Sequence, residues 1–251
     1  IRNNTLISTD LRINLMSTQT QNMASETQQT RQMIKRLIVQ EFHIYQKQFA
    51  AYVIGLLIGL TLIGMAKTWA FYAGGMILLV LLICVGGFAI QSSLLNERRE
   101  HTLSFMMSLP MTPMTFFWSK VLANLVLYLV PFLIVVAGTA FLVLFTPLPD
   151  GILIWSFLIY GFLATNYFIS LSAALVLESE GWNIFVQIAV STFVGPFMVV
   201  LGTIDAIGKK IQSNEVVLSQ EALGIFALEL SVMLLALAFA RSVYRRKDSF
   251  L

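Results

Sequence analysis

The feature that most constrains this fold is a series of six long apolar segments. They contain 18, 27, 25, 26, 23 and 19 residues, which suits the roughly 20 residues that a helix needs to cross a bilayer. Only the sixth contains a formally charged residue, Glu229. The segments are 49–66, 69–95, 121–145, 152–177, 182–204 and 222–240. The sequence therefore predicts an all-α integral membrane protein with six transmembrane helices.

The composition agrees with a membrane protein and argues against other classes. Of 251 residues, 57% are hydrophobic and 12% are charged, about half the charged share of an average soluble domain. The basic residues that give the net charge of +3 lie at the ends of the apolar segments, so they indicate orientation in the bilayer rather than nucleic-acid binding. Cys84 is the single cysteine, and His43 and His101 have no further ligands at zinc-site spacing, so neither a disulfide nor a metal site is predicted.

Two polar stretches precede the first apolar segment. Residues 1–32 form a polar tail that is predicted to be disordered, and it could be an extension because the chain begins with Ile rather than Met. Residues 33–48 place apolar side chains such as Leu37, Ile38 and Phe42 on one helical face and basic or polar side chains on the other. This pattern predicts an amphipathic helix that lies in the membrane interface, before a six-span domain that covers residues 49–251.

The distribution of basic residues predicts the orientation of the chain. Six crossings place both termini on one side, and that side carries 13 of the 16 Lys and Arg residues. Only Lys67, Lys209 and Lys210 lie on the opposite side, and omitting the polar tail still leaves 10 against 3. The positive-inside rule therefore places both termini in the cytoplasm.

The fifth apolar segment and the connection after it are less regular than the rest. Gly195 and Pro196 are expected to interrupt the fifth segment. Residues 205–221 are interpreted as an external connection, part of which could re-enter the outer leaflet instead of crossing cleanly.

A charged and then semi-polar insert, residues 97–120, separates the second and third apolar segments. Four of its first five residues are charged, so it must lie outside the hydrocarbon. A helical wheel places Leu103, Met107 and Leu109 on one side and polar residues on the other, and Pro110 ends the pattern. The insert is therefore predicted to form a short amphipathic helix on the cytoplasmic surface.

This insert resembles the corresponding region of ABC transporter type-2 permeases. In that family the pattern reads roughly Glu-Arg-x-x-Gly-Thr-Leu, later Leu-Pro-Val-Ser or similar, and later Gly-Lys, between the second and third of six spans. The matching residues are Glu97, Arg98, Thr102, Leu103, Leu109, Pro110, Met111, Thr112 and Lys120. His101 and Ser119 stand where glycine is common. By topology the resemblance extends from residue 33 to the C-terminus.

The resemblance implies a permease subunit of an ATP-driven exporter in the plasma membrane, that is, the bacterial inner membrane. Such a subunit pairs with a second permease subunit, here expected to be a second copy in a homodimer, and with two copies of a separate ATPase subunit that binds ATP and Mg²⁺. The chain has no G-x-x-x-x-G-K-[ST] motif, so it is expected to bind no cofactor and not to be an enzyme by itself. The residues that would couple to the ATPase are Glu97, Arg98, Arg99, Glu100, Thr102, Leu103, Met107, Pro110, Glu178 and Glu180.

Polar residues inside the apolar segments are candidates for a substrate pathway, because such groups usually face protein or water rather than lipid. These candidates are Asn124, Asn166, Tyr167 and Glu229. Hydrogen bonding between helices is the commoner use of such residues, so both interpretations stay open. Gly86 and Gly87 are interpreted as a site of close helix packing.

Two other functions stay open on the sequence alone. An intramembrane enzyme would need His, Glu, Asp or Ser groups within catalytic reach of one another, and Glu229 is the only deep ionisable residue. A channel or structural subunit that works without an ATPase would not require the insert 97–120. Lipids, peptides, antibiotics and ions are all compatible substrates.

Overall fold

The structure, a computed structural model, describes residues 46–95, 113–177, 179–213, 216 and 218–246, and its regular elements there are all helices. Six helical stretches are long and apolar enough to cross a membrane. They are Gln46–Gly64, Thr68–Leu94, Phe117–Phe145, Ile152–Val176, Glu180–Thr203 and Gln220–Val243. The prediction of an all-α protein with six apolar helices of spanning length is confirmed. The polar tail 1–32 and nearly all of the predicted interfacial helix 33–48 lie outside the described residues.

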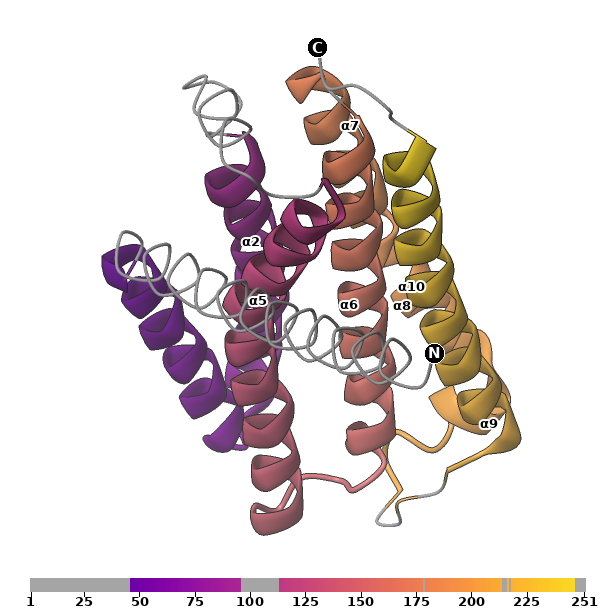
Figure 1. Cartoon of the computed structure of the whole chain (residues 1–251). Helices are drawn as coiled ribbons and strands as arrows, with labels where there is room; N and C mark the ends of the chain where they lie inside the picture. Colours follow the sequence, from indigo (N-terminus) through magenta and orange to yellow (C-terminus); the bar gives the residue numbers. More distant parts are fainter. Residues whose placement is uncertain (1–45, 96–112, 178, 214–215, 217, 247–251) are drawn as a thin grey trace, which may run out of the picture. The chain divides into compact units, whose positions relative to one another are not determined.

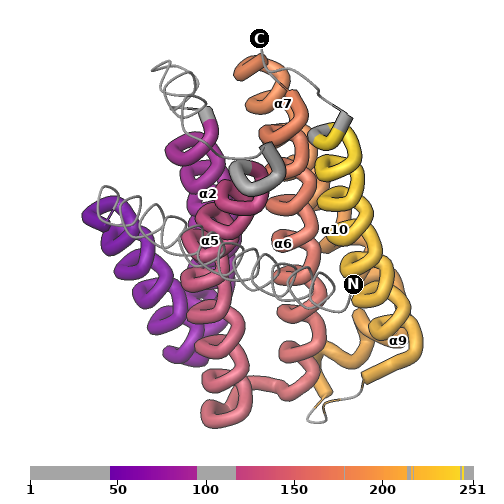
Figure 2. The backbone as a smooth tube through the Cα atoms, viewed as in Figure 1, coloured from indigo at the N-terminus to yellow at the C-terminus, as the bar shows by residue number. Residues whose placement is uncertain are grey.

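Figures 1 and 2 trace the order of the described helices by colour along the chain. The first span, Gln46–Gly64, ends in a turn at Ala66, whose φ angle is 51°. The elements after this turn are α2 (Thr68–Ile90), the π-helix η1 (Gln91–Leu95), α5 (Pro113–Phe145), α6 (Ile152–Val176), α7 (Glu180–Thr192), α8 (Val194–Thr203), α9 (Asp205–Gly208) and α10 (Gln220–Arg246). Within residues 46–246, the last turn of α2, the first turns of α5 and α7 and the last turn of α10 lie at the same end of the bundle (Figure 1).

The third helix begins earlier than the sequence suggested. The insert was expected to extend to Lys120, with a turn at Pro113, but α5 starts at Pro113. Proline suits the first position of a helix, because its missing N–H has no intrahelical acceptor there. Lys120 therefore lies inside a helix and not at the end of a loop, and its side chain is only 2% exposed.

The fifth span is broken into two helices, as the sequence predicted. Helix α7 ends at Thr192 and α8 begins at Val194, with Phe193 between them. Pro196 has no N–H with which to bond the carbonyl of Thr192, so the regular helical ladder cannot continue through this point. The Phe193 N–H instead donates to the carbonyl of Val190 at 3.2 Å.

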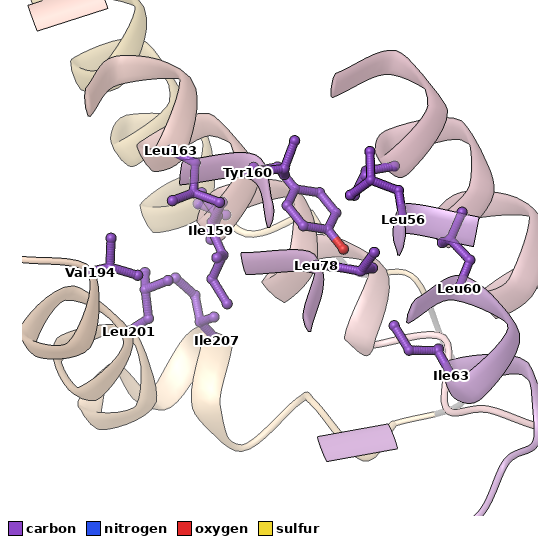
Figure 3. Packing of buried hydrophobic residues seen from close by; sticks show 14 residues of the cluster. Leu56, Leu60, Ile63, Leu78, Ile159, Tyr160, Leu163, Val194, Leu201 and Ile207 are labelled. Carbon is purple, nitrogen blue, oxygen red and sulfur yellow. The ribbon is translucent and has the colours of Figure 1, made fainter. Parts of the chain in front are cut away.

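Helix α6 is the most buried span of the described bundle. In its most apolar stretch 56% of the residues are buried, against 11% in α10 and 11% across α7 and α8. One core cluster joins α6 to the first span and α2, and Figure 3 shows the Tyr160 ring extending from α6 toward Leu56 and Leu78. A second cluster joins α6 to α2 and α5 through residues such as Val85 and Val121. Helix α6 therefore packs against both α2 and α5.

Candidate functional site

The two helices that flank the insert are joined next to it. The side-chain Nζ of Lys120 on α5 donates to the main-chain oxygen of Ser93 in η1, at 3.5 Å. The Nδ2 of Asn124 donates to the main-chain oxygen of Lys120 at 3.0 Å. A buried cation in a spanning segment is costly unless polar groups surround it, and π-helical turns are frequent at functional sites. The residues Ser93, Lys120 and Asn124, which we call the insert root, therefore fix the end of α2 to the beginning of α5.

The predicted coupling residues of the insert itself, from Glu97 to Pro110, lie outside the described residues, and so does Glu178. Glu180 is described, and it is the first residue of α7. A carboxylate at this position is stabilised by the positive end of the helix dipole. Three residues later, the Nδ2 of Asn183 donates to the main-chain oxygen of Leu177 at 3.4 Å. This bond closes the short connection between α6 and α7, at the same end of the bundle as the insert root (Figure 1).

A second set of residues joins the four helices α2, α5, α6 and α7. The Tyr167 ring of α6 stacks on the Tyr128 ring of α5, with centroids 3.9 Å apart and planes 8° apart. A Cβ atom at Gly86 of α2 would lie 3.1 Å from the Tyr167 ring, and one at Gly87 would collide with the side-chain amide of Gln187 on α7. We call these five residues the glycine contact. The interpretation of Gly86 and Gly87 as a close packing site is confirmed, because a larger residue would displace these neighbours.

The glycine contact leaves little room for a substrate. It borders a space of about 20 Å³ that is also lined by Asn166, Ser170 and Ser191. Such a volume suits one water molecule, whereas pockets for small molecules have roughly 300–1,000 Å³. Asn166 Nδ2 and Tyr167 Oη are buried without a hydrogen-bond partner among the described residues. These two candidates thus share one small polar space, and neither Asn124 nor Glu229 lines it.

Glu229 is buried between α10 and α6. Its side chain is 3% exposed, and neither carboxylate oxygen has a hydrogen-bond partner among the described residues. It lies against Gly161, where an added Cβ would collide with Oε2. The absence of a side chain at Gly161 therefore makes room for this carboxylate. Buried polar residues of membrane helices usually hydrogen-bond to a neighbouring helix. In the described part of the chain, Glu229 has no such partner.

Sequence reasoning missed a larger space, a cavity of about 450 Å³ that is lined mainly by α2, α5 and α6. Thr139 and Tyr160 line it, and their hydroxyl groups hydrogen-bond to each other at 2.9 Å. The sequence contains both hydroxyls within apolar segments, but they are 21 residues apart on different helices. No spacing rule within one helix relates them, so this pair required the tertiary structure.

The fold and these sites define a multi-pass α-helical membrane protein with a tied insert root and a separate apolar cavity. Within the described residues, no group of three His, Cys, Asp or Glu side chains is placed to hold a metal ion. No protein-family model, curated protein or solved structure matches the chain.

Proposed function

We propose that the chain is the membrane-spanning permease subunit of an ATP-binding-cassette exporter. The observation that carries this proposal is the charged insert with the Glu-Arg, Thr-Leu and Leu-Pro pattern between the second and third of six apolar helices. In this proposal the ATPase is a separate subunit that binds ATP and Mg²⁺. Two copies of it act on a permease homodimer. The complex lies in the bacterial inner membrane.

The contacts of the insert root support a coupling role. A segment attached to α2 alone would transmit a push to one helix, whereas the Lys120–Ser93 bond ties α5 to the same point. The stacked rings of Tyr128 and Tyr167 then connect α5 to α6. Packed interiors transmit displacement because they have few voids. In this mechanism, closure of the ATPase subunits moves the insert, and α2, α5 and α6 move together.

The outer faces of α7 and α10 are apolar and exposed, which is consistent with a second permease subunit or lipid as their neighbour. Large side chains on these faces include Trp182, Phe185, Ile188, Leu234, Leu235 and Phe239. In water such surfaces would aggregate, but in a bilayer they contact lipid chains or another membrane subunit.

The decisive experiment is co-purification with candidate ATPase subunits, preferably one encoded beside this chain. We expect stoichiometric co-elution and ATPase activity with the wild-type chain, and loss of both with Glu97→Ala and with Leu103→Asp. The matched control is Lys209→Ala, because Lys209 lies in the predicted external connection and forms an exposed ion pair with Asp205 at 3.0 Å. The proposal fails if no ATPase co-elutes, or if the insert variants co-elute as well as Lys209→Ala does.

The insert root can be tested separately from ATPase binding. Lys120→Met keeps an unbranched side chain, one atom shorter than that of lysine, but removes the bond to Ser93. We expect this variant to co-elute with the ATPase, while the ATPase activity of the complex falls toward that of the free ATPase subunit. Unchanged activity would show that coupling does not pass through Lys120.

A further inference from the structure

The cavity between α2, α5 and α6 is large enough to hold part of a ligand. Its volume of about 450 Å³ lies within the roughly 300–1,000 Å³ of small-molecule sites. The lining includes Phe71 and Leu79 of α2, Val143 of α5, and Trp155 and Ile159 of α6. The cavity is open at the surface of the bundle, so the surrounding medium, water or lipid, can fill it.

Gly75 is one reason why the cavity exists. It lines the cavity, and a Cβ atom built there would meet nothing within 4 Å. The preceding residue, Gly74, faces the other way, and its Cβ would lie 2.6 Å from the main-chain oxygen of Gly59. Adjacent glycines of α2 therefore serve different purposes: one permits helix contact and the other leaves space.

The cavity opens on the side of the bundle. Tyr72 and Met76 line it, and they are 71% and 66% exposed. At 1.5 Å per residue they lie about 6 Å and about 12 Å along α2 from Thr68. The 27-residue span is about 40 Å long, against roughly 30 Å for the hydrocarbon core, so Tyr72 lies near the interface and Met76 lies within the hydrocarbon. Beside Met76 the medium is therefore lipid.

The two buried hydroxyl groups of the lining, on Thr139 and Tyr160, do not require water. Thr139 and Tyr160 satisfy each other through their 2.9 Å hydrogen bond, and Tyr72 and Ser156 supply the other two hydroxyl groups of the lining. Figure 3 shows that the Tyr160 ring extends toward Leu56 and Leu78. No charged residue lines the cavity. A charged solute would lose its hydration there without compensation, whereas a hydrocarbon chain would lose nothing.

We propose that this cavity binds one acyl chain of a membrane lipid, which enters from the bilayer between Tyr72 and Met76 and packs against Phe71, Trp155 and Ile159. The site is separate from the insert root and requires no ATPase subunit. The bound acyl chain would fill the space that α2, α5 and α6 leave between them.

The test is photo-labelling of the full chain in nanodiscs. The probe is a phosphatidylcholine with a diazirine near the end of one acyl chain, and labelled peptides are mapped by mass spectrometry. We expect labelling of the half-buried Trp155 and the buried Ile159, together with labelling of the exposed residue Phe239 on α10 as an internal reference. Labelling of Phe239 without labelling of Trp155 or Ile159 in the wild-type chain would overturn the proposal.

A cavity-filling variant provides the comparison. Gly75→Leu places a side chain in the cavity, and we expect labelling of Trp155 relative to Phe239 to fall about tenfold, the equivalent of ~1.4 kcal/mol. Gly224→Leu is the matched control, because a Cβ at Gly224 on α10 also meets nothing within 4 Å but Gly224 does not line the cavity. Equal labelling of Trp155 in the two variants would refute the site.

A second probe keeps the test informative if Gly75→Leu does not fold. A water-soluble diazirine is applied to the wild-type chain under the same conditions. We expect it to label the exposed connection around Lys209 and not Trp155 or Ile159. Labelling of the cavity residues by this probe would show that the space holds water, and would overturn the proposal.

Discussion

Helices α2 and α6 enclose an open space in one half of the bundle and meet closely in the other. At the glycine contact, Gly86 and Gly87 are covered by Tyr167 of α6 and Gln187 of α7, and the remaining space is about 20 Å³. Around Gly75 the same two helices border a cavity of about 450 Å³. Glycine occurs in both regions, so its presence does not distinguish a packing site from a binding site. The neighbouring side chains make the distinction.

The difference also suggests a division of roles. In a membrane, helices associate through van der Waals contact at small residues and not through the hydrophobic effect, so the glycine contact is a firm joint. It lies nearer than the cavity to the insert root, where a coupling movement would arrive. The cavity half has fewer contacts to lose, and we propose that lipid supplies them there.

The largest expected effect comes from Gly74→Ala. This variant tests whether Gly74 packs closely against the first span, next to the cavity that Gly75 lines. The new methyl group would meet the main-chain oxygen of Gly59 at 2.6 Å and the main-chain nitrogen of Ile63 at 3.0 Å. Main-chain atoms cannot rotate away, so we expect the free energy of unfolding to fall by about 1–3 kcal/mol. Thermal unfolding of the purified protein in detergent measures this loss.

The matched control for that variant is the next residue. Gly75→Ala should not lower the thermal midpoint, because its methyl group has open space and alanine favours a helix over glycine by up to about 1 kcal/mol. Equal destabilisation by the two variants would contradict the assignment of Gly74 to a contact and Gly75 to a cavity.

The next effect concerns the glycine contact itself. Gly87→Ala should destabilise the protein because the methyl group displaces the Gln187 amide, but the same change in a Gln187→Ala background should cost much less. We expect a coupling energy of about 0.5–3 kcal/mol from the double-mutant cycle, measured by thermal unfolding. If the effects of Gly87→Ala and Gln187→Ala on the free energy of unfolding were additive, the Gln187 amide would not hold α2 and α7 together.

The smallest effect is expected from the hydroxyl pair of the cavity. Thr139→Val deprives Tyr160 of its hydrogen-bond partner, and such bonds between membrane helices average about 0.6 kcal/mol, with values up to about 1.7 kcal/mol. Thr192→Val is the control, because that exposed hydroxyl donates only within its own helix, to the carbonyl of Ile188 at 2.8 Å. A difference between the two variants in thermal midpoint confirms the pair, whereas identical midpoints would argue against it.

Several properties of the candidate site were visible in the sequence. Asn124, Asn166 and Glu229 stood out because polar side chains are rare in spanning helices, and all three are buried. The sequence did not indicate that Glu229 would lie against Gly161, because these residues are on α10 and α6. The coupling role of the insert stays a prediction, since residues 97–112 are not among those described.

The sequence by itself determined the six apolar helices and the break before Pro196. Both are local properties, because the length of an apolar segment decides whether it can span a bilayer, and a missing N–H interrupts a helix wherever it occurs. The tertiary structure alone decided that Lys120 ties α5 to η1, that Gly74 and Gly75 differ, and that Thr139 meets Tyr160. These facts depend on which side chains of distant helices occupy the same space, and helical periodicity within one segment does not specify its neighbours.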